Sequence, residues 1–171
     1  PSVLVVWGCE HLRSNADGYI GHWLVQCMQR GTEVISIDPI LTWWGVHAKY
    51  WLPLRPGTDL CIALAWLYVI TQEDLIDHEF VDNWCAYYDM LKDYVAAPSE
   101  NNDMMGYTPA WASKVTGVPE EDIIASARFY ANAERGAIQW GLPFDTQVDS
   151  MHACLAVCDL MAICGNVDRP G

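Results

Sequence analysis

Two short β-branched apolar runs, separated by one amphipathic segment, most constrain how this chain folds. The runs cover residues 2–7 and 33–37. Between them, apolar side chains recur at helical spacing over residues 20–28, which predicts a helix with one buried face. We expect Asn15 or Asp17 to cap the start of this helix. A strand, a crossover helix and a second strand within so short a stretch form a parallel βαβ unit.

The rest of the chain continues to alternate strands with helices. Further strands are predicted at residues 50–54 and 137–140, and further helices at residues 59–71, 77–84, 119–132 and 151–162. Residues 88–110 are rich in Pro, Asn and Gly and are interpreted as an irregular surface excursion. The pattern predicts one α/β domain over residues 1–171, with a Rossmann-like parallel sheet flanked by helices in three α/β/α layers.

Charge and cysteine content exclude several classes of partner. The chain carries 22 acidic and nine basic side chains, a formal net charge of −13, so we expect no nucleic-acid partner. No apolar run reaches the roughly 20 residues of a spanning helix, so we expect no direct membrane insertion. Seven cysteines without a C-x-x-C pair predict small buried side chains in a reduced setting, and no metal site.

Ligands of open parallel sheets bind beyond the carboxyl ends of the strands, where loops and helix N-termini converge. Four segments of this chain are expected there, at residues 8–15, 38–42, 55–59 and 140–145. The first offers a glycine for close backbone approach and the N-terminus of the following helix, a combination that suits a pyrophosphate.

Two carboxylates stand at these predicted strand ends. Asp38 is placed to accept hydrogen bonds from ribose hydroxyls, and Asp59 is placed to accept from the N1–H and 2-amino donors of a guanine. Considered singly, Asp59 is more often a helix cap, Asp38 is more often a turn residue, and Gly8 is uninformative. Their joint placement at successive strand ends favours a nucleotide site.

Other chemistries have weaker support. The full G-x-G-x-x-G fingerprint is absent, which disfavours a nicotinamide or flavin dehydrogenase domain. The five histidines are scattered, and only His11 falls within an expected ligand loop. No spacing supports a nucleophile paired with a base, so we assign no catalytic residue and no metal ligand.

A series of motifs resembles the large catalytic subunits of the dimethyl sulfoxide reductase family, which carry bis-molybdopterin guanine dinucleotide. The most specific motif is RPGTD, at residues 55–59, followed by its apolar helix. The others follow the family's order and spacing across almost the whole chain: VVWG at 5–8, SNADG at 14–18, GHW at 21–23, VISIDP at 34–39, LTW at 41–43, DHEFV at 77–81, YTPAWA at 107–112, TGVP at 116–119, ARFYA at 127–131, QWG at 139–141 and GNVDRPG at 165–171.

The resemblance implies a cofactor site in the same four loops. It implies that residues 7–14 run along the phosphates, that residues 38–42 contact the guanosine, that residues 57–59 read the guanine, and that residues 140–141 lie towards the pterin. The cofactor-binding residues expected on this basis are Trp7, Gly8, Cys9, Glu10, His11, Arg13, Ser14, Asp38, Pro39, Thr42, Gly57, Thr58, Asp59, Trp140 and Gly141.

Two departures from the family pattern fall in the phosphate loop and beside it. Cys9, Glu10 and His11 stand where the family often has Asn-Asn-Pro or Asn-Pro, and Ile40 stands where it usually has arginine. Losing an arginine removes a charge-assisted phosphate contact, and Glu10 adds like-charge repulsion. Arg13 is the candidate that would compensate.

The resemblance also implies what lies outside this stretch. We expect a fragment of a larger molybdenum or tungsten oxidoreductase, inactive by itself, whose partners are the rest of the parent subunit and an iron–sulfur electron-transfer subunit. A [4Fe-4S] cluster and a metal-ligating residue are expected elsewhere in the parent. The alternative is a non-catalytic interaction module that keeps the fold and has lost the cofactor.

Overall fold

Four parallel strands form the centre of the molecule in the computed structural model, which describes residues 1–14 and 18–169. They lie in the order β3-β2-β1-β4 and comprise β1 (Val3–Trp7), β2 (Glu33–Ile37), β3 (Tyr50–Leu52) and β4 (Gly136–Trp140). Trp7 lies in register with Ile37 on one side and with Trp140 on the other, so three strands end at one edge. The predicted α/β fold with a Rossmann-like parallel sheet is confirmed.

One face of the sheet is covered by α1 (Tyr19–Gln29) and the short α2 (Trp43–His47). Leu4, Val6 and Val34 of the strands form a small core with Trp44, against which the half-buried side chains of α1 pack. The residue that precedes α1 is Gly18, in a left-handed conformation. The expected caps Asn15 and Asp17 lie outside the described residues.

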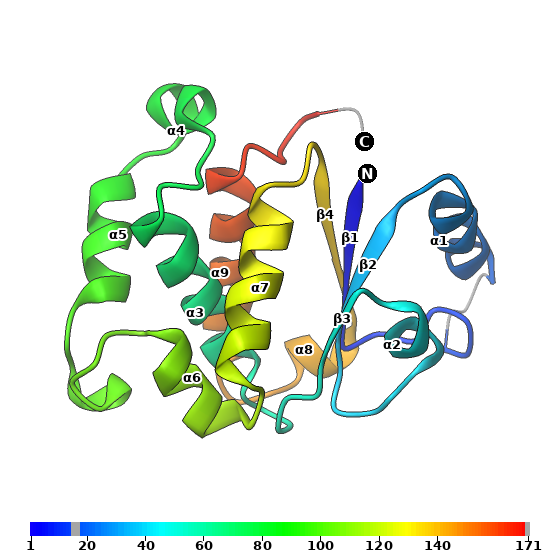
Figure 1. The fold of residues 1–171 in the computed structure, drawn as a ribbon, viewed down its shortest axis with the longest axis horizontal. Coiled ribbons are helices and arrows are strands. Elements are labelled where there is room, and N and C mark those ends of the chain that lie inside the picture. Colours follow the sequence, from blue (N-terminus) through cyan, green and yellow to red (C-terminus); the bar gives the residue numbers. More distant parts are fainter. Residues whose placement is uncertain (15–17, 170–171) are drawn as a thin grey trace.

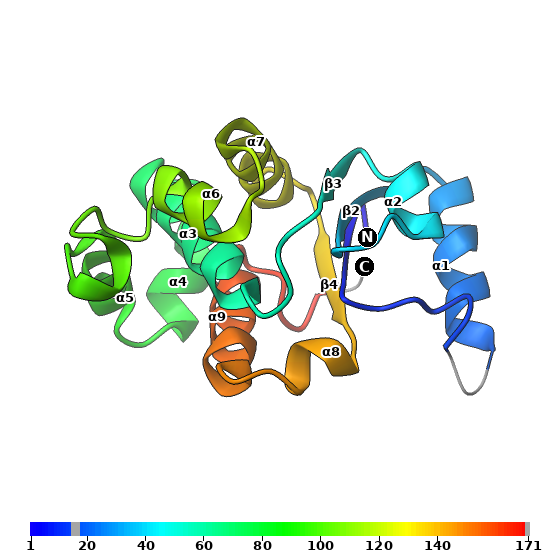
Figure 2. The ribbon, with the colours of Figure 1, turned by 90° about the horizontal axis from the view of Figure 1, so that it is seen from below.

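The other face carries the larger core, under α3 (Asp59–Gln72), α7 (Glu120–Ala131) and α9 (Ser150–Ile163) (Figure 1). Helix α3 is apolar on nearly every side because it packs against α5, α6, α7 and α9. Beyond it lie α4 (His78–Trp84), α5 (Tyr88–Ala96) and α6 (Pro109–Thr116). Figure 2 shows the sheet between the α1 and α2 side and this thicker helical side.

The segment at residues 88–110 is more ordered than its composition predicts. Its first part is helix α5, a 3₁₀ turn covers Glu100–Asn102, and α6 begins at Pro109. The buried Asn102 side chain accepts from the backbone N–H groups of Ser99 and Gly106 and donates to the carbonyl of Ala97. The interpretation as an irregular excursion was therefore wrong, because the side chain of one asparagine hydrogen-bonds the backbone groups of the segment between the two helices.

Three short helices, α2, α6 and α8 (Leu142–Asp145), were not predicted, and the third strand is shorter than expected. It ends at Leu52 because Pro53 has no N–H to donate to the ladder.

The cysteines are less buried than expected. All seven are free, six are half-buried and Cys158 is exposed. Over residues 1–14 and 18–169, no group of three or more His, Cys, Asp or Glu side chains is placed to hold a metal ion. Within the same residues, no helix is both long enough and apolar enough to cross a membrane.

The central strand β2 provides a test of the core. Ile35 is fully buried, so Ile35→Ala removes packed methylene groups and leaves a cavity. We expect it to lower the free energy of unfolding by about 3 kcal/mol in urea titrations. Glu33→Ala on the same strand, which loses only an exposed ion pair with Lys49, should change it by less than about 0.5 kcal/mol. Equal losses in the two variants would contradict this packing.

Candidate functional site

The candidate site lies at the point where the order of strands along the sheet changes direction. The strands after β1 are added on one side of it as far as β3, and β4 is then added on its other side. From β1 the chain crosses to β2 on one side, whereas β4 joins β1 on the other side after a crossover on the opposite face. The loops that follow β1 and β4 therefore diverge and leave a crevice at the carboxyl edge. A cavity of about 820 Å³ opens there, which is within the size range of small-molecule sites.

Ten of the fifteen expected cofactor-binding residues line this cavity. They come from the loop after β1, the loop after β2 and the end of β4: Gly8, Cys9, Glu10, His11, Arg13, Ser14, Asp38, Thr42, Trp140 and Gly141. Segments separated by up to 133 residues of sequence, from Gly8 to Gly141, thus meet at one place, as their positions at strand ends predict. Their contact with a cofactor remains a prediction.

The other five expected residues do not line the cavity. Pro39 is exposed beside Asp38, and Gly57 and Thr58 lie in the turn before α3. Trp7 is completely buried. Its indole Nε1–H donates to Asp59 Oδ1 at 2.7 Å, which ties the start of α3 to the end of β1.

Two lining residues lay outside the four predicted segments, Trp43 and Gln139. Trp43 is the first residue of α2 and stacks on His47, with ring centroids 4.1 Å apart. Gln139 is exposed on β4 next to the buried Ile138. Both residues stand in motifs of the family series, QWG and LTW, but neither was assigned to the site, and α2, which begins at Trp43, was not predicted.

Acidic side chains are among those that line the cavity. Asp38 Oδ1 accepts from the backbone N–H of Ile40 at 2.8 Å. Partial burial raises the pKa of Asp38 from its ordinary value, the Ile40 hydrogen bond opposes this shift, and the charges of Glu10 and Asp59 reinforce it. Holding three carboxylates near one another costs stability, a feature that is more frequent at functional sites than elsewhere.

The loop after β1 places uncharged groups inside the cavity. Burial raises the pKa of the Cys9 thiol to about 12, and its Sγ donates to the carbonyl of Gln139 at 3.3 Å. Burial also lowers the pKa of His11, which favours the neutral ring at pH 7. Among the described residues, Glu10 Oε1 and His11 Nδ1 are buried without a hydrogen-bond partner. Buried polar atoms of this kind are usually satisfied by a partner, which a ligand would provide.

Positive charge at the cavity is sparse. In the part of the chain that the structure describes, Arg13 is the only lysine or arginine that lines it, and its side chain is exposed. Ile40 lines the cavity from the position next to Pro39, where the family pattern has arginine. The geometry therefore provides more hydrogen-bond acceptors than cations.

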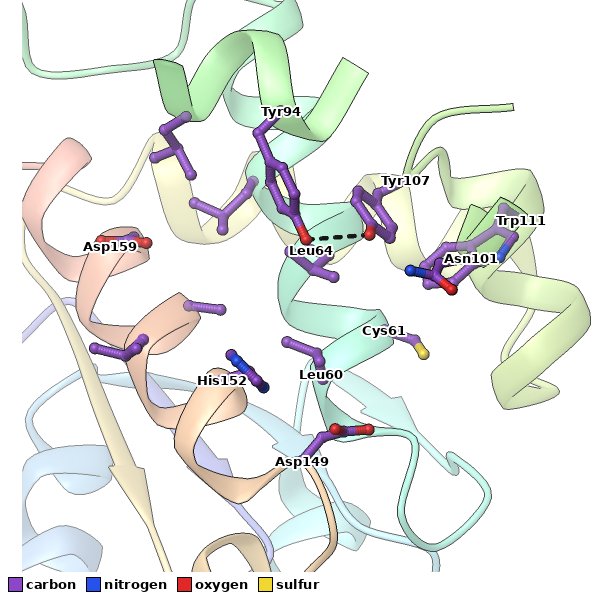
Figure 3. A pocket seen from close by; sticks show the side chains of 14 residues that line it. Leu60, Cys61, Leu64, Tyr94, Asn101, Tyr107, Trp111, Asp149, His152 and Asp159 are labelled. Atoms are coloured by element: carbon purple, nitrogen blue, oxygen red, sulfur yellow. Dashed lines mark hydrogen bonds between the residues drawn. The ribbon is translucent and has the colours of Figure 1, made fainter. Parts of the chain in front are cut away.

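A second cavity, of about 640 Å³, lies within the helical side, between α3, α5, α6 and α9 (Figure 3). Leucine side chains form much of its lining, and the Tyr94 and Tyr107 hydroxyls lie 3.2 Å apart across it. It contains none of the fifteen expected residues.

Known proteins resemble the chain over most of its length. It is 33% identical over 155 residues to the alpha subunit of a formate dehydrogenase from Methanococcus maripaludis, covering 89% of this chain and 21% of that protein. It is 32% identical over 168 residues to a dimethyl sulfoxide reductase from Escherichia coli, covering 91% and 21%.

A solved structure agrees with these relatives. Acetylene hydratase from Pelobacter acetylenicus superposes with a TM-score of 0.83 at 30% identity, over 98% of this chain and 22% of that one. No protein-family model matches the chain. The chain spans about a fifth of the length of the curated relatives it matches.

The fold and these relatives define a Rossmann-like α/β unit of a molybdopterin enzyme. The chain belongs to the dimethyl sulfoxide reductase family of molybdopterin enzymes.

The close approach of the β1 and β4 ends predicts the effect of enlarging Gly141. A Cβ atom there would lie 2.5 Å from the Gly8 carbonyl oxygen and 2.6 Å from Cys9 Cβ. We expect Gly141→Ala to lower the free energy of unfolding by about 1–3 kcal/mol, because backbone must shift. Leu142→Ala, at the exposed next residue, should be nearly neutral in the same urea titration. A neutral Gly141→Ala would show that these strand ends are farther apart than described.

The raised pKa of Asp38 predicts a pH-dependent stability. Because its folded pKa exceeds its ordinary value of 3.8, the ionised carboxylate destabilises the fold as pH rises. Asp38→Asn keeps an acceptor for the Ile40 N–H and removes the charge. We expect it to raise the free energy of unfolding at pH 7.5 by about 0.5–1 kcal/mol, a gain that shrinks as pH falls towards 4.

The matched control for this experiment is Asp93→Asn, at an exposed position of α5, which should change stability by less than about 0.5 kcal/mol at either pH. A destabilising Asp38→Asn at pH 7.5 would mean that the carboxylate is favourably paired in the fold.

Proposed function

We propose that this chain binds the guanosine diphosphate end of one molybdopterin guanine dinucleotide, and that the whole protein is a molybdenum or tungsten oxidoreductase. The observation that carries the proposal is the convergence of the loops after β1, β2 and β4 on one cavity at the strand reversal, with the α3 carboxylate of Asp59 tied to β1. Family membership supports it, because these relatives are molybdopterin enzymes.

The residues present suit the guanosine end of this cofactor. Asp38 and Asp59 are half-buried carboxylates, and the charge of Asp59 contributes to the raised pKa of Asp38. Ribose hydroxyls and the guanine N1–H and 2-amino groups are donors, and carboxylates accept from such donors strongly. Glu10 Oε1 and His11 Nδ1, which have no partner among the described residues, offer further polar contacts in the loop after β1 that lines the cavity.

The phosphate end has weaker support. Arg13 and backbone N–H groups of the loop after β1 are the candidate donors, and Glu10 lies in the same loop. We propose that backbone donors carry this contact, as they do where helix N-termini hold anions. Trp140 and Gly141 would then lie towards the pterin.

When bound, the cofactor supplies the redox chemistry at its metal, while this chain contributes binding and orientation. Gly141 allows the end of β4 to approach the Gly8 carbonyl and Cys9 closely, which narrows the floor between the two strand ends, and the neutral Cys9 and His11 add no charge that would compete for the ligand. We further propose that the whole protein holds a [4Fe-4S] cluster and a metal-ligating residue outside this stretch. Its partners would be the remainder of the catalytic subunit and an iron–sulfur electron-transfer subunit.

One observation favours a second candidate function. Acidic side chains line the cavity, and Ile40 stands where the family pattern has arginine. Both features suit a pyrophosphate poorly. A domain that keeps the family fold as a non-catalytic interaction module would tolerate both features.

Changing the base-reading carboxylate distinguishes the two candidates. A carboxylate at residue 59 pairs with the N1–H and 2-amino donors of guanine, whereas an asparagine pairs with N1–H and donates to the C2 carbonyl of xanthine. We expect Asp59→Asn to weaken guanosine diphosphate binding by about tenfold or more and to strengthen xanthosine diphosphate binding. Nuclear magnetic resonance titration of the chain measures both, including weak affinities.

Asp145→Asn is the matched control, because it makes the same substitution at another carboxylate of this edge, where Asp145 lines the cavity and accepts from the indole N–H of Trp140 at 3.1 Å. It should leave the ratio of the two nucleotide affinities unchanged. If the native chain shows no guanosine diphosphate binding at millimolar ligand, or if Asp59→Asn leaves that ratio unchanged, the interaction module becomes the better account.

A further inference from the structure

The indole of Trp7 occupies an unusual place between the core and the candidate site. Trp7 is the last residue of β1 and is completely buried, with its ring packed against Trp66 and Phe144 at centroid distances of 6.0 and 5.2 Å. Its Nε1–H donates to Asp59 Oδ1 at 2.7 Å, a short charge-assisted bond. The ring is thus held by the core while its donor reaches the first residue of α3.

Asp59 has no comparable restraint from its own helix. The Thr58 side chain makes no cap bond, and its Oγ1 donates to the carbonyl of Arg55 at 2.7 Å. A carboxylate at the first position of a helix otherwise rotates freely about its side-chain bonds. The Trp7 bond engages one edge of Oδ1, which leaves Oδ2 and the second lone pair of Oδ1 to accept from another donor pair.

Other tryptophans show that this bond is specific. Trp44 and Trp66 are equally buried, yet among the described residues their indole N–H groups have no hydrogen-bond partner. Trp51 and Trp140 donate to the Asp38 carbonyl and to the Asp145 carboxylate, at 3.0 and 3.1 Å. Among these five indoles, only Trp7 and Trp140 donate to a carboxylate, and of these two only Trp7 is completely buried.

We propose that Trp7 is a positioning residue that orients the Asp59 carboxylate and thereby sets discrimination in favour of guanine over bases that lack the 2-amino group. This rests on the proposed function, because it names how the same site reads its ligand. Without the indole donor, the carboxylate samples several orientations, and only one of them meets two parallel donors. The sequence assigned Trp7 only to a phosphate-loop motif, and its complete burial behind the cavity lining gives no sign of this role.

Comparing guanosine diphosphate with inosine diphosphate isolates the 2-amino contact, because inosine differs only by lacking that group. We expect the native chain to bind guanosine diphosphate about tenfold more tightly or better, the usual effect of one hydrogen bond to a carboxylate. Trp7→Phe keeps an aromatic ring between Trp66 and Phe144 but removes the N–H. Its preference should fall to about threefold or less, with inosine diphosphate affinity nearly unchanged.

Trp66→Phe is the matched control. It makes the same substitution in the same aromatic cluster, where the ring stacks on Tyr130. The indole N–H of Trp66 has no hydrogen-bond partner among the described residues. It should lose similar packing and keep the native preference. The indole N–H resonance that disappears in Trp7→Phe should also move upfield in Asp59→Asn, which reports the bond in the absence of any ligand.

The outcomes separate the two proposals. If Trp7→Phe keeps the native preference, or if Trp66→Phe loses it equally, positioning by Trp7 is overturned while the guanosine site stands. If the native chain binds neither nucleotide, the proposed function fails, and the inference fails with it. Loss of preference in Trp7→Phe alone, in a variant whose far-ultraviolet circular dichroism is native, supports the positioning role.

Discussion

The parallel register of β1 between β2 and β4 is the constraint on which the rest of the structure depends. It aligns Trp7 with Ile37 and with Trp140, so that the loops after three strands begin at one level. The crossovers to β2 and β4 lie on opposite faces, and only for this reason do those loops separate into a cavity. A shift of one residue in either ladder would exchange the side chains that face the two helical layers along the whole strand.

The candidate site is costly for the fold that builds it. Glu10, Asp38 and Asp59 hold negative charges close together, and burial further disfavours the ionised form of Asp38. Two buried polar atoms in the loop after β1 lack partners among the described residues. Packing alone would select apolar side chains at such positions, so these choices are better explained by a ligand that supplies hydrogen-bond donors. The same acidity is why the guanosine end is the better supported part of the proposed site.

Much of the fold was predictable because it depends on local pattern. The β-branched runs at residues 2–7 and 33–37 became adjacent parallel strands, and the apolar helix after residue 58 became the most buried helix. The short helices α2, α6 and α8 were missed because few residues carry their periodicity. The error at residues 88–110 has another cause, since the side chain of Asn102 orders that loop through three hydrogen bonds that no spacing rule encodes.

The location of the site was predictable, but the hydrogen bonds between its residues were not. Strand-end reasoning brought together ten of the fifteen expected residues, because parallel strands end at one edge whatever their side chains. The bond between Trp7 and Asp59 joins positions 52 residues apart and depends on the depth at which α3 packs against β1. Depth of packing is set by the whole core, with Trp66 and Phe144 against Trp7, and a single sequence does not reveal it.

The central claim is that the guanosine diphosphate end of the cofactor binds at the carboxyl edge of the sheet. The most direct test is to titrate the chain with guanosine diphosphate and to map the shifts of its amide resonances. The account predicts that shifts concentrate in residues 8–14, 38–42, 57–59 and 140–141. Shifts confined to the second cavity, between α3, α5, α6 and α9, or no saturable shifts at all, would contradict it.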